Sequence, residues 1–281
     1  MKGREFRTPR IVSYILSFLM TILFIILYMG IGFQLGFFNS LSVLKAIDES
    51  GYYDKAYEDL YRNSEEAITG AKLPLSILTD VVTKDYVYME CKNYVDNSLS
   101  GQVPSVDSTE LKEKLSERMK TYYLSENAGN TWAEEQDVKT VVDKIGAQYE
   151  EAVTVELAKE FNDNKSRYER VIQGAVVLSA FLIAMISLLL LKIHRHVYRT
   201  IRYIMYSILS SAVIIILAAL ISVASGMYNQ SYLEPDYYRQ VISAYLKWDL
   251  MLFLYIGGIS TIVGIGLIYF NRYLKDRVVN R

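Results

Sequence analysis

The chain has 281 residues, of which 52% are hydrophobic, and its formal net charge at pH 7 is -1. A balance this close to neutral excludes the basic composition of most nucleic-acid-binding proteins, so we expect no nucleic-acid partner. Cys91 is the only cysteine in the sequence, which excludes an internal disulfide framework. A lone cysteine favours a bacterial plasma membrane over a disulfide-rich secreted protein.

Four segments are long and apolar enough to cross a bilayer. Each contains about 20 residues without Asp, Glu, Lys, Arg or His, the length that a helix needs to span roughly 30 Å of hydrocarbon. Together they predict an all-α, multi-pass membrane protein with four transmembrane helices. The predicted spans are residues 11–33, 171–191, 203–225 and 250–271.

Segments with an excess of basic residues flank the predicted spans on one side only. They occupy the amino-terminal residues 1–10, the turn 192–202 and the carboxy-terminal residues 272–281, whereas residues 39–170 carry 16 basic and 26 acidic side chains. Because cytoplasmic segments are rich in Lys and Arg, both termini and the turn are expected in the cytoplasm. Four residues of the turn are the predicted topology anchors, namely Lys192, Arg195, Arg199 and Arg202.

Residues 34–170 are then expected outside the cytoplasm, as one domain of ordinary size. Its apolar residues recur at three- or four-residue steps, which predicts a helical domain without strands. A shorter external loop, residues 226–249, is expected to hold one helix before the fourth span. The clearest helical stripes are Leu111, Leu115 and Met119, and then Val138, Val142, Ile145, Tyr149, Val153 and Phe161.

The helical pattern after Thr131 has no proline or strong turn cluster before the second span. It therefore predicts one continuous rod from Thr131 to Leu191, with residues 162–166 as its weakest point, because Asn, Asp and Ser are poor helix formers.

The chain's two histidines, His194 and His196, lie in the basic turn. A His-x-His pair can bind a metal, but no Cys, Asp or Glu lies nearby to complete a ligand set. We therefore expect neither a metal nor a cofactor. The turn is better interpreted as a topology anchor that contacts anionic lipid headgroups.

Nothing in the sequence indicates catalysis. Residues 34–170 contain no histidine, and motifs such as G-x-S-x-G, H-E-x-x-H and C-x-x-C are absent. The predicted spans contain no ionisable residue of the kind that ion-coupled transporters use. They do contain small residues at four-residue steps, which favour close helix packing within the bundle or with a partner. These predicted packing residues are Ala180, Ala184, Ala218, Ser222, Ser260 and Gly264.

The order of one span, a large external domain, two spans joined by a short basic turn, a small external loop and a final span resembles the FtsX family of division proteins. That resemblance covers topology only and implies a relay to external partners. The segments "NSLSVLKAIDESGYYDKAYEDLY" and "HRHVYRTIRYIMYSILSSAVIIIL" are similar to uncharacterised four-span membrane proteins of Gram-positive bacteria. Neither resemblance assigns a functional residue.

Two classes of function remain open. The first is a non-enzymatic membrane protein whose external helical domain binds a partner or senses an envelope condition. The second is a pore-forming or transport-complex subunit. For both we expect the lipid bilayer as one partner and a membrane or envelope protein, including a second copy of the chain, as another.

Overall fold

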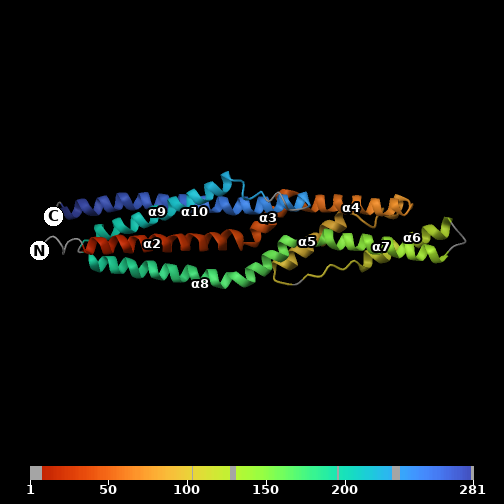
Figure 1. The fold of residues 1–281 in the computed structure, drawn as a ribbon, viewed down its shortest axis with the longest axis horizontal. Coiled ribbons are helices and arrows are strands. Elements are labelled where there is room, and N and C mark those ends of the chain that lie inside the picture. The colour runs from red at the N-terminus through yellow and green to blue at the C-terminus, as the bar shows by residue number, and fades with distance from the viewer. Residues whose placement is uncertain (1–7, 103, 127–130, 195, 230–234, 280–281) are drawn as a thin grey trace. The chain divides into compact units, whose positions relative to one another are not determined.

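The structure is a computed structural model that describes residues 8–102, 104–126, 131–194, 196–229 and 235–279. These residues form helices and connecting loops, with no strand among them, which confirms the predicted helical class (Figure 1). The helices are α2 (Thr8–Gly32), the π-helix η1 (Phe33–Phe37), α3 (Ser40–Ser50), α4 (Tyr52–Gly70), the 3₁₀ helix η2 (Leu75–Ile77), α5 (Lys84–Leu99), α6 (Thr109–Glu126), α7 (Thr131–Val153), α8 (Glu156–Ile193), α9 (Val197–Ala224) and α10 (Asp236–Val279).

Four helices are long and apolar enough to cross a membrane, as the sequence predicts. They are α2 with η1, α8, α9 and α10. The helix predicted for the second external loop is not separate from the fourth span, because α10 runs without a break from Asp236 to Val279. The chain forms two compact units, and α8 and α10 contribute residues to both.

The first unit, called the four-helix unit, comprises the described residues within 1–42, 164–231 and 242–281. Hydroxylated residues and a few large apolar ones make its helix contacts. Ser17 of α2 and Ser207 of α9 lie 2.9 Å apart, Oγ to Oγ, and both are buried. Beside them Met20, Leu190 and Tyr203 form a small buried apolar cluster. These contacts join α2, α8 and α9.

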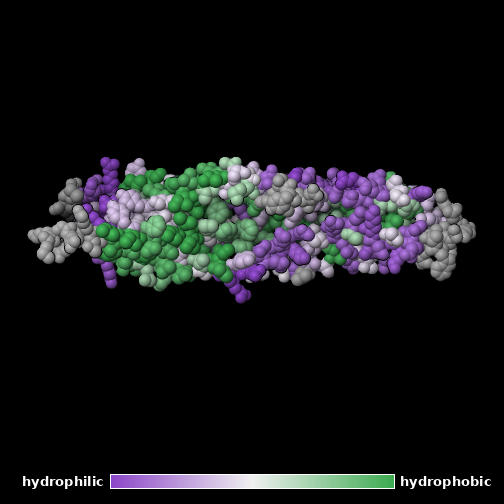
Figure 2. Space-filling view, viewed as in Figure 1, coloured by the Kyte–Doolittle hydropathy of each residue, from purple (hydrophilic) through white to green (hydrophobic). Residues whose placement is uncertain are grey.

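Large apolar side chains cover the outside of the four-helix unit, where Figure 2 shows a dense hydrophobic surface. Val177 of α8 is 69% exposed and Ile262 of α10 is 71% exposed. A large exposed surface of apolar side chains is unfavourable in water, but it is compatible with the hydrocarbon chains of lipids.

The second unit, called the polar unit, comprises the described residues within 43–163 and 232–241. Its surface is hydrophilic in Figure 2, and its core is aliphatic and aromatic. Leu111, Leu115 and Met119 of α6 are each at most 1% exposed, so the predicted stripe is confirmed. The predicted apolar residues of α7 are also buried: Val138, Val142, Ile145, Tyr149 and Val153.

Residues 235–241 belong to the polar unit although they are distant in sequence from its main segment, residues 43–163. The ring of Tyr237 packs edge-on against Tyr52 of α4, with centroids 5.2 Å apart. Val241 is fully buried, and the Lys55 ammonium donates to the side chain of Gln240. The polar unit therefore has other bounds than the predicted domain 34–170: its main segment runs from Val43 to Asp163, and it takes in the first residues of α10.

The predicted rod from Thr131 to Leu191 is wrong. Helix α7 ends at Val153 and α8 begins at Glu156, so Thr154 and Val155 interrupt the helix. The segment 162–166, expected to be the weak point, lies inside α8. Three consecutive β-branched residues, Val153 to Val155, lie at the break, and such residues have a slightly lower helix propensity. Thr154 Oγ1 also donates to the Glu150 carbonyl at 2.7 Å, a bond that bends helices.

Candidate functional site

The break between α7 and α8 opens a pocket of about 440 Å³ in the polar unit. That volume lies within the range of about 300 to 1,000 Å³ that is usual for small-ligand sites. The lining combines tyrosine rings with carboxylates and contains no Lys or Arg side chain. Its residues are Tyr52 of α4, Ala147, Glu150 and Glu151 of α7, Thr154 in the break, Glu156 of α8, and Pro235, Tyr237 and Tyr238 around the start of α10.

The carboxylates of this pocket differ in how they are balanced. Glu150 accepts a hydrogen bond from Ser108 and lies 3.5 Å from the Lys112 ammonium, Oε1 to Nζ. Glu156 is in the first turn of α8, where the positive end of the helix dipole stabilises an acid. Glu151 has neither advantage. It is in the last turn of α7, which has no basic residue, and no ion pair among the described residues includes it.

Tyr52 forms the floor of the pocket, since it is only 3% exposed. Burial, then the nearby Tyr237 phenol, raises the pKa of Tyr52 far above its usual value, so the hydroxyl stays neutral at physiological pH. Tyr237 and Tyr238 are half-buried and leave part of each ring accessible. The pocket therefore presents neutral aromatic rings beside acidic side chains.

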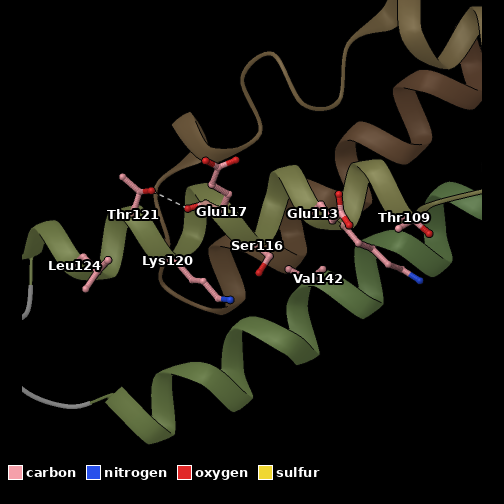
Figure 3. A pocket seen from close by; sticks show the side chains of 9 residues that line it. Thr109, Glu113, Ser116, Glu117, Lys120, Thr121, Leu124 and Val142 are labelled. Carbon is pink, nitrogen blue, oxygen red and sulfur yellow. Dashed lines mark hydrogen bonds between the residues drawn. The ribbon is translucent and has the colours of Figure 1, made fainter.

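A second hollow, of about 610 Å³, runs along α6 and is shown in Figure 3. All but one of its lining residues come from α6, and Val142 of α7 completes it. In Figure 3, Glu117 and Thr121 extend away from α7. Thr121 Oγ1 donates to the Glu117 carbonyl at 2.8 Å, so its hydroxyl is used within the helix. This shallow, single-helix surface is a weaker candidate for a ligand than the pocket at the break.

Asp249 is an acidic residue buried in the four-helix unit. It is 7% exposed, and neither carboxylate oxygen has a hydrogen-bond partner among the described residues. Its Oδ1 lies against Gly36 of η1, only 2.6 Å from where a Cβ at that glycine would be. One turn earlier, the Tyr245 hydroxyl donates to the Phe37 carbonyl. The predicted spans contain no ionisable residue, but Asp249 belongs to the continuous helix α10, one residue before the predicted fourth span.

The predicted topology anchors lie at the ends of α8 and α9. Lys192 is exposed in the last turn of α8. Arg199 and Arg202 are exposed in the first turns of α9, where their guanidinium carbons lie 5.8 and 5.6 Å from the ring centroids of Tyr198 and Tyr203. Arg195 is outside the described residues.

The two histidines of the turn have different partners. His194 Nε2 lies 2.9 Å from the Ser13 hydroxyl, and its ring stacks on Tyr203 at 5.2 Å between centroids. His196 stacks instead on Tyr198. Burial, then the charges of Arg199 and Arg202, lowers the pKa of His194. No group of three His, Cys, Asp or Glu side chains in the described chain could hold a metal ion.

The predicted packing residues divide into two groups. Ala180, Ala184 and Ala218 are exposed within the chain, and the Ser222 hydroxyl is used by its own helix, donating to the Ala218 carbonyl at 2.9 Å. Ser260 and Gly264 of α10 are buried. A Cβ at Gly264 would be 2.3 Å from Leu209 Cδ2, so α9 and α10 approach closely there.

Sequence reasoning missed the glycines at the end of the first span. A Cβ at Gly32 would meet the ring of Phe253 at 2.2 Å, and one at Gly36 would meet Asp249. Gly32 and Gly36 form a GxxxG pattern, which permits close helix contact, and Asp249 and Phe253 are likewise four residues apart on α10. The GxxxG pattern is the signal that could have identified this contact from the sequence.

Comparisons with protein-family models, curated proteins and solved structures find no match to this chain.

Proposed function

We propose that this chain is a non-enzymatic, multi-pass membrane protein whose polar unit lies outside the cytoplasm and binds a partner or ligand from the cell envelope. The pocket at the break between α7 and α8 carries the proposal, because it combines ligand-sized volume with an aromatic and acidic lining. In this proposal the four apolar helices anchor the protein and the basic flanks keep both termini in the cytoplasm. A Gram-positive plasma membrane is the proposed location.

Cysteine labelling of intact cells tests the orientation. The native thiol gives little background, because Cys91 is fully buried and burial raises its pKa to about 12. A membrane-impermeant maleimide should label Asn93→Cys, which replaces an exposed residue of α5, and should spare Asp276→Cys near the carboxy terminus. The reverse labelling pattern would overturn the proposed orientation.

Photo-crosslinking in intact membranes tests binding at the pocket. A photoreactive phenylalanine analogue placed at Tyr237 should give a discrete adduct, whereas the same group at Glu117, in the hollow of Figure 3, should not. The adduct should disappear when Glu151→Lys is added, since that change places a cation in the pocket. No adduct at Tyr237, or the same adduct from both positions, would contradict the proposed binding role.

A transport-complex or pore-forming subunit is the second candidate function, and Asp249 favours it. A carboxylate buried without a partner in a membrane helix is costly and is usually retained for moving ions or protons. Purified protein in liposomes loaded with a pH-sensitive dye should then dissipate a proton gradient, and Asp249→Asn should abolish the flux. Equal leak from both proteins and from empty liposomes would exclude proton conduction by the chain alone.

A further inference from the structure

The pocket at the break between α7 and α8 has an excess of negative potential. The carbonyl end of α7 carries the negative end of its helix dipole, and Glu150 and Glu151 are both near that end. Lys112 partly neutralises Glu150, but Glu151 is left without an ion-pair partner among the described residues. Acidic side chains at a helix carboxy terminus are destabilising, because they lie near the negative end of the helix dipole. A cation in the pocket would reduce this electrostatic repulsion.

The tyrosine rings of the pocket point to the same class of ligand. Ring faces attract cations through their quadrupole, most strongly where water is excluded. Elsewhere in the described chain Arg and Lys side chains already occupy such positions, for example Arg277 at 4.8 Å from the ring centroid of Tyr273. No such pair among the described residues uses Tyr52, Tyr237 or Tyr238. Tyr237 and Tyr238 are half-buried and keep part of each ring accessible to a cation from outside the chain, with the buried Tyr52 beneath them.

The shape of the site favours an organic cation over a metal ion. The carboxylates of the pocket do not converge, since no metal-sized cluster of acidic side chains occurs in the described residues. A volume of about 440 Å³ is also much larger than a single ion requires. An alkylammonium group matches both halves of the lining, because its charge faces the acids and its carbon atoms contact the rings.

We infer that this pocket is a binding site for a small alkylammonium ligand, with Glu151 as the charge partner and Tyr52, Tyr237 and Tyr238 as the aromatic wall. The inference rests on the proposed binding function and names the ligand class for that site. Either a free quaternary amine or the primary ammonium of a lysine side chain supplies this chemistry. The experiment below distinguishes these two ligand sources.

Saturation-transfer NMR on the full chain in lipid nanodiscs provides the test, with choline and Nα-acetyl-lysine amide as separate probes. At least one probe should bind saturably, with a dissociation constant of roughly 0.1 to 10 mM at low salt, as expected for a few ring contacts and one carboxylate. Choline alone binding would assign a free quaternary amine, whereas binding of the lysine probe would assign a side-chain ammonium.

Two variants test the assigned residues. Glu151→Gln should weaken the bound probe by about 5-fold or more and reduce the dependence of binding on salt, because it removes the unpaired charge. Tyr237→Leu should weaken it by about 5-fold through loss of one ring, whereas Tyr237→Phe, which keeps the ring and guards against misfolding, should bind within about 2-fold of the native chain. Glu117→Gln is the matched control for charge, since Glu117 is exposed in the hollow of Figure 3.

The ligand inference is overturned if neither probe binds saturably, or if Glu117→Gln weakens binding as much as Glu151→Gln. Failure of both probes, combined with a discrete crosslink from position 237, would refute the ligand class and leave the binding function in place. Failure of both probes with no crosslink would refute the function as well.

Discussion

The two units of the chain differ in how far their helix contacts depend on small residues. In the four-helix unit, serine and glycine such as Ser17, Ser207 and Gly264 lie at the helix contacts beside a small apolar cluster, whereas the polar unit has an extended core of large apolar side chains. In water, burying large apolar side chains drives helices together. In lipid that driving force is absent, and helices associate where small residues allow backbones to approach. The difference indicates that each unit is built for its own solvent.

The largest expected effect comes from removing a core side chain of the polar unit. Leu115 is fully buried, so Leu115→Ala should lower the free energy of unfolding of that unit by about 2 to 5 kcal/mol. Leu124→Ala, at a residue of α6 that is 78% exposed, is the control and should change it little. Protease susceptibility of the polar unit in a temperature series measures both. Equal losses would show that burial does not control stability here.

The four-helix unit should be sensitive to added volume instead. A Cβ at Gly257 would be 2.4 Å from Ile216 Cγ1, whereas one at Gly258 would meet nothing within 4 Å. We expect Gly257→Leu to destabilise the protein by about 1 to 3 kcal/mol through overpacking. Its neighbour Gly258→Leu should be close to neutral. Thermal unfolding in detergent micelles distinguishes them, and similar melting temperatures would contradict the close contact of α9 and α10.

Alkaline pH should destabilise the polar unit through its buried phenols and thiol. Burial raises the pKa values of Tyr52 and Tyr149, and raises that of Cys91 to about 12. The unfolded chain ionises these groups near pH 9 to 10, so the stabilisation is complete below that range and is lost as the pH rises toward 12. Each group contributes a slope of up to about 1.4 kcal/mol per pH unit. Thermal unfolding followed by circular dichroism from pH 8 to 11 should show the decline, and Tyr52→Phe should reduce its slope.

The smallest effect is expected from removing one hydroxyl group between helices. Ser207 Oγ lies 2.8 Å from the Ser17 carbonyl, and Ser207→Ala should cost about 0.6 kcal/mol, the average for such bonds in membrane helices. Ser222→Ala removes a hydroxyl that bonds within its own helix and provides the control. Reversible unfolding in mixed micelles has the required precision. If Ser207→Ala lowered the free energy of unfolding by more than about 2 kcal/mol, the hydrogen bonds of this serine would matter more to the unit than close packing does.

Much of the fold could be predicted from the sequence because its signals are local. Four charge-free apolar segments indicate the candidate membrane helices, and the spacing of Leu111, Leu115 and Met119 predicts the buried face of α6. The orientation of the spans and the role of the basic turn stay predictions.

The candidate site could not be predicted, because it depends on contacts between distant segments. Tyr52 meets Tyr237 only once the first turn of α10 joins the polar unit. The break at Thr154 had no distinctive local signal: no proline or glycine marks it, and a run of β-branched residues also occurs inside the continuous helix α9. Asp249 was assigned to a loop, since hydropathy alone does not show that a carboxylate is buried against Gly36.

The two residues between α7 and α8 also allow one bound molecule to touch side chains on both sides of a helix break. The pocket is lined from both sides of the break, by Glu151 before it and Glu156 after it, and by rings from α4 and α10. An occupant that contacts all of these holds them together and stabilises that single arrangement. At ten times its dissociation constant, it would stabilise the folded polar unit by about 1.4 kcal/mol against unfolding.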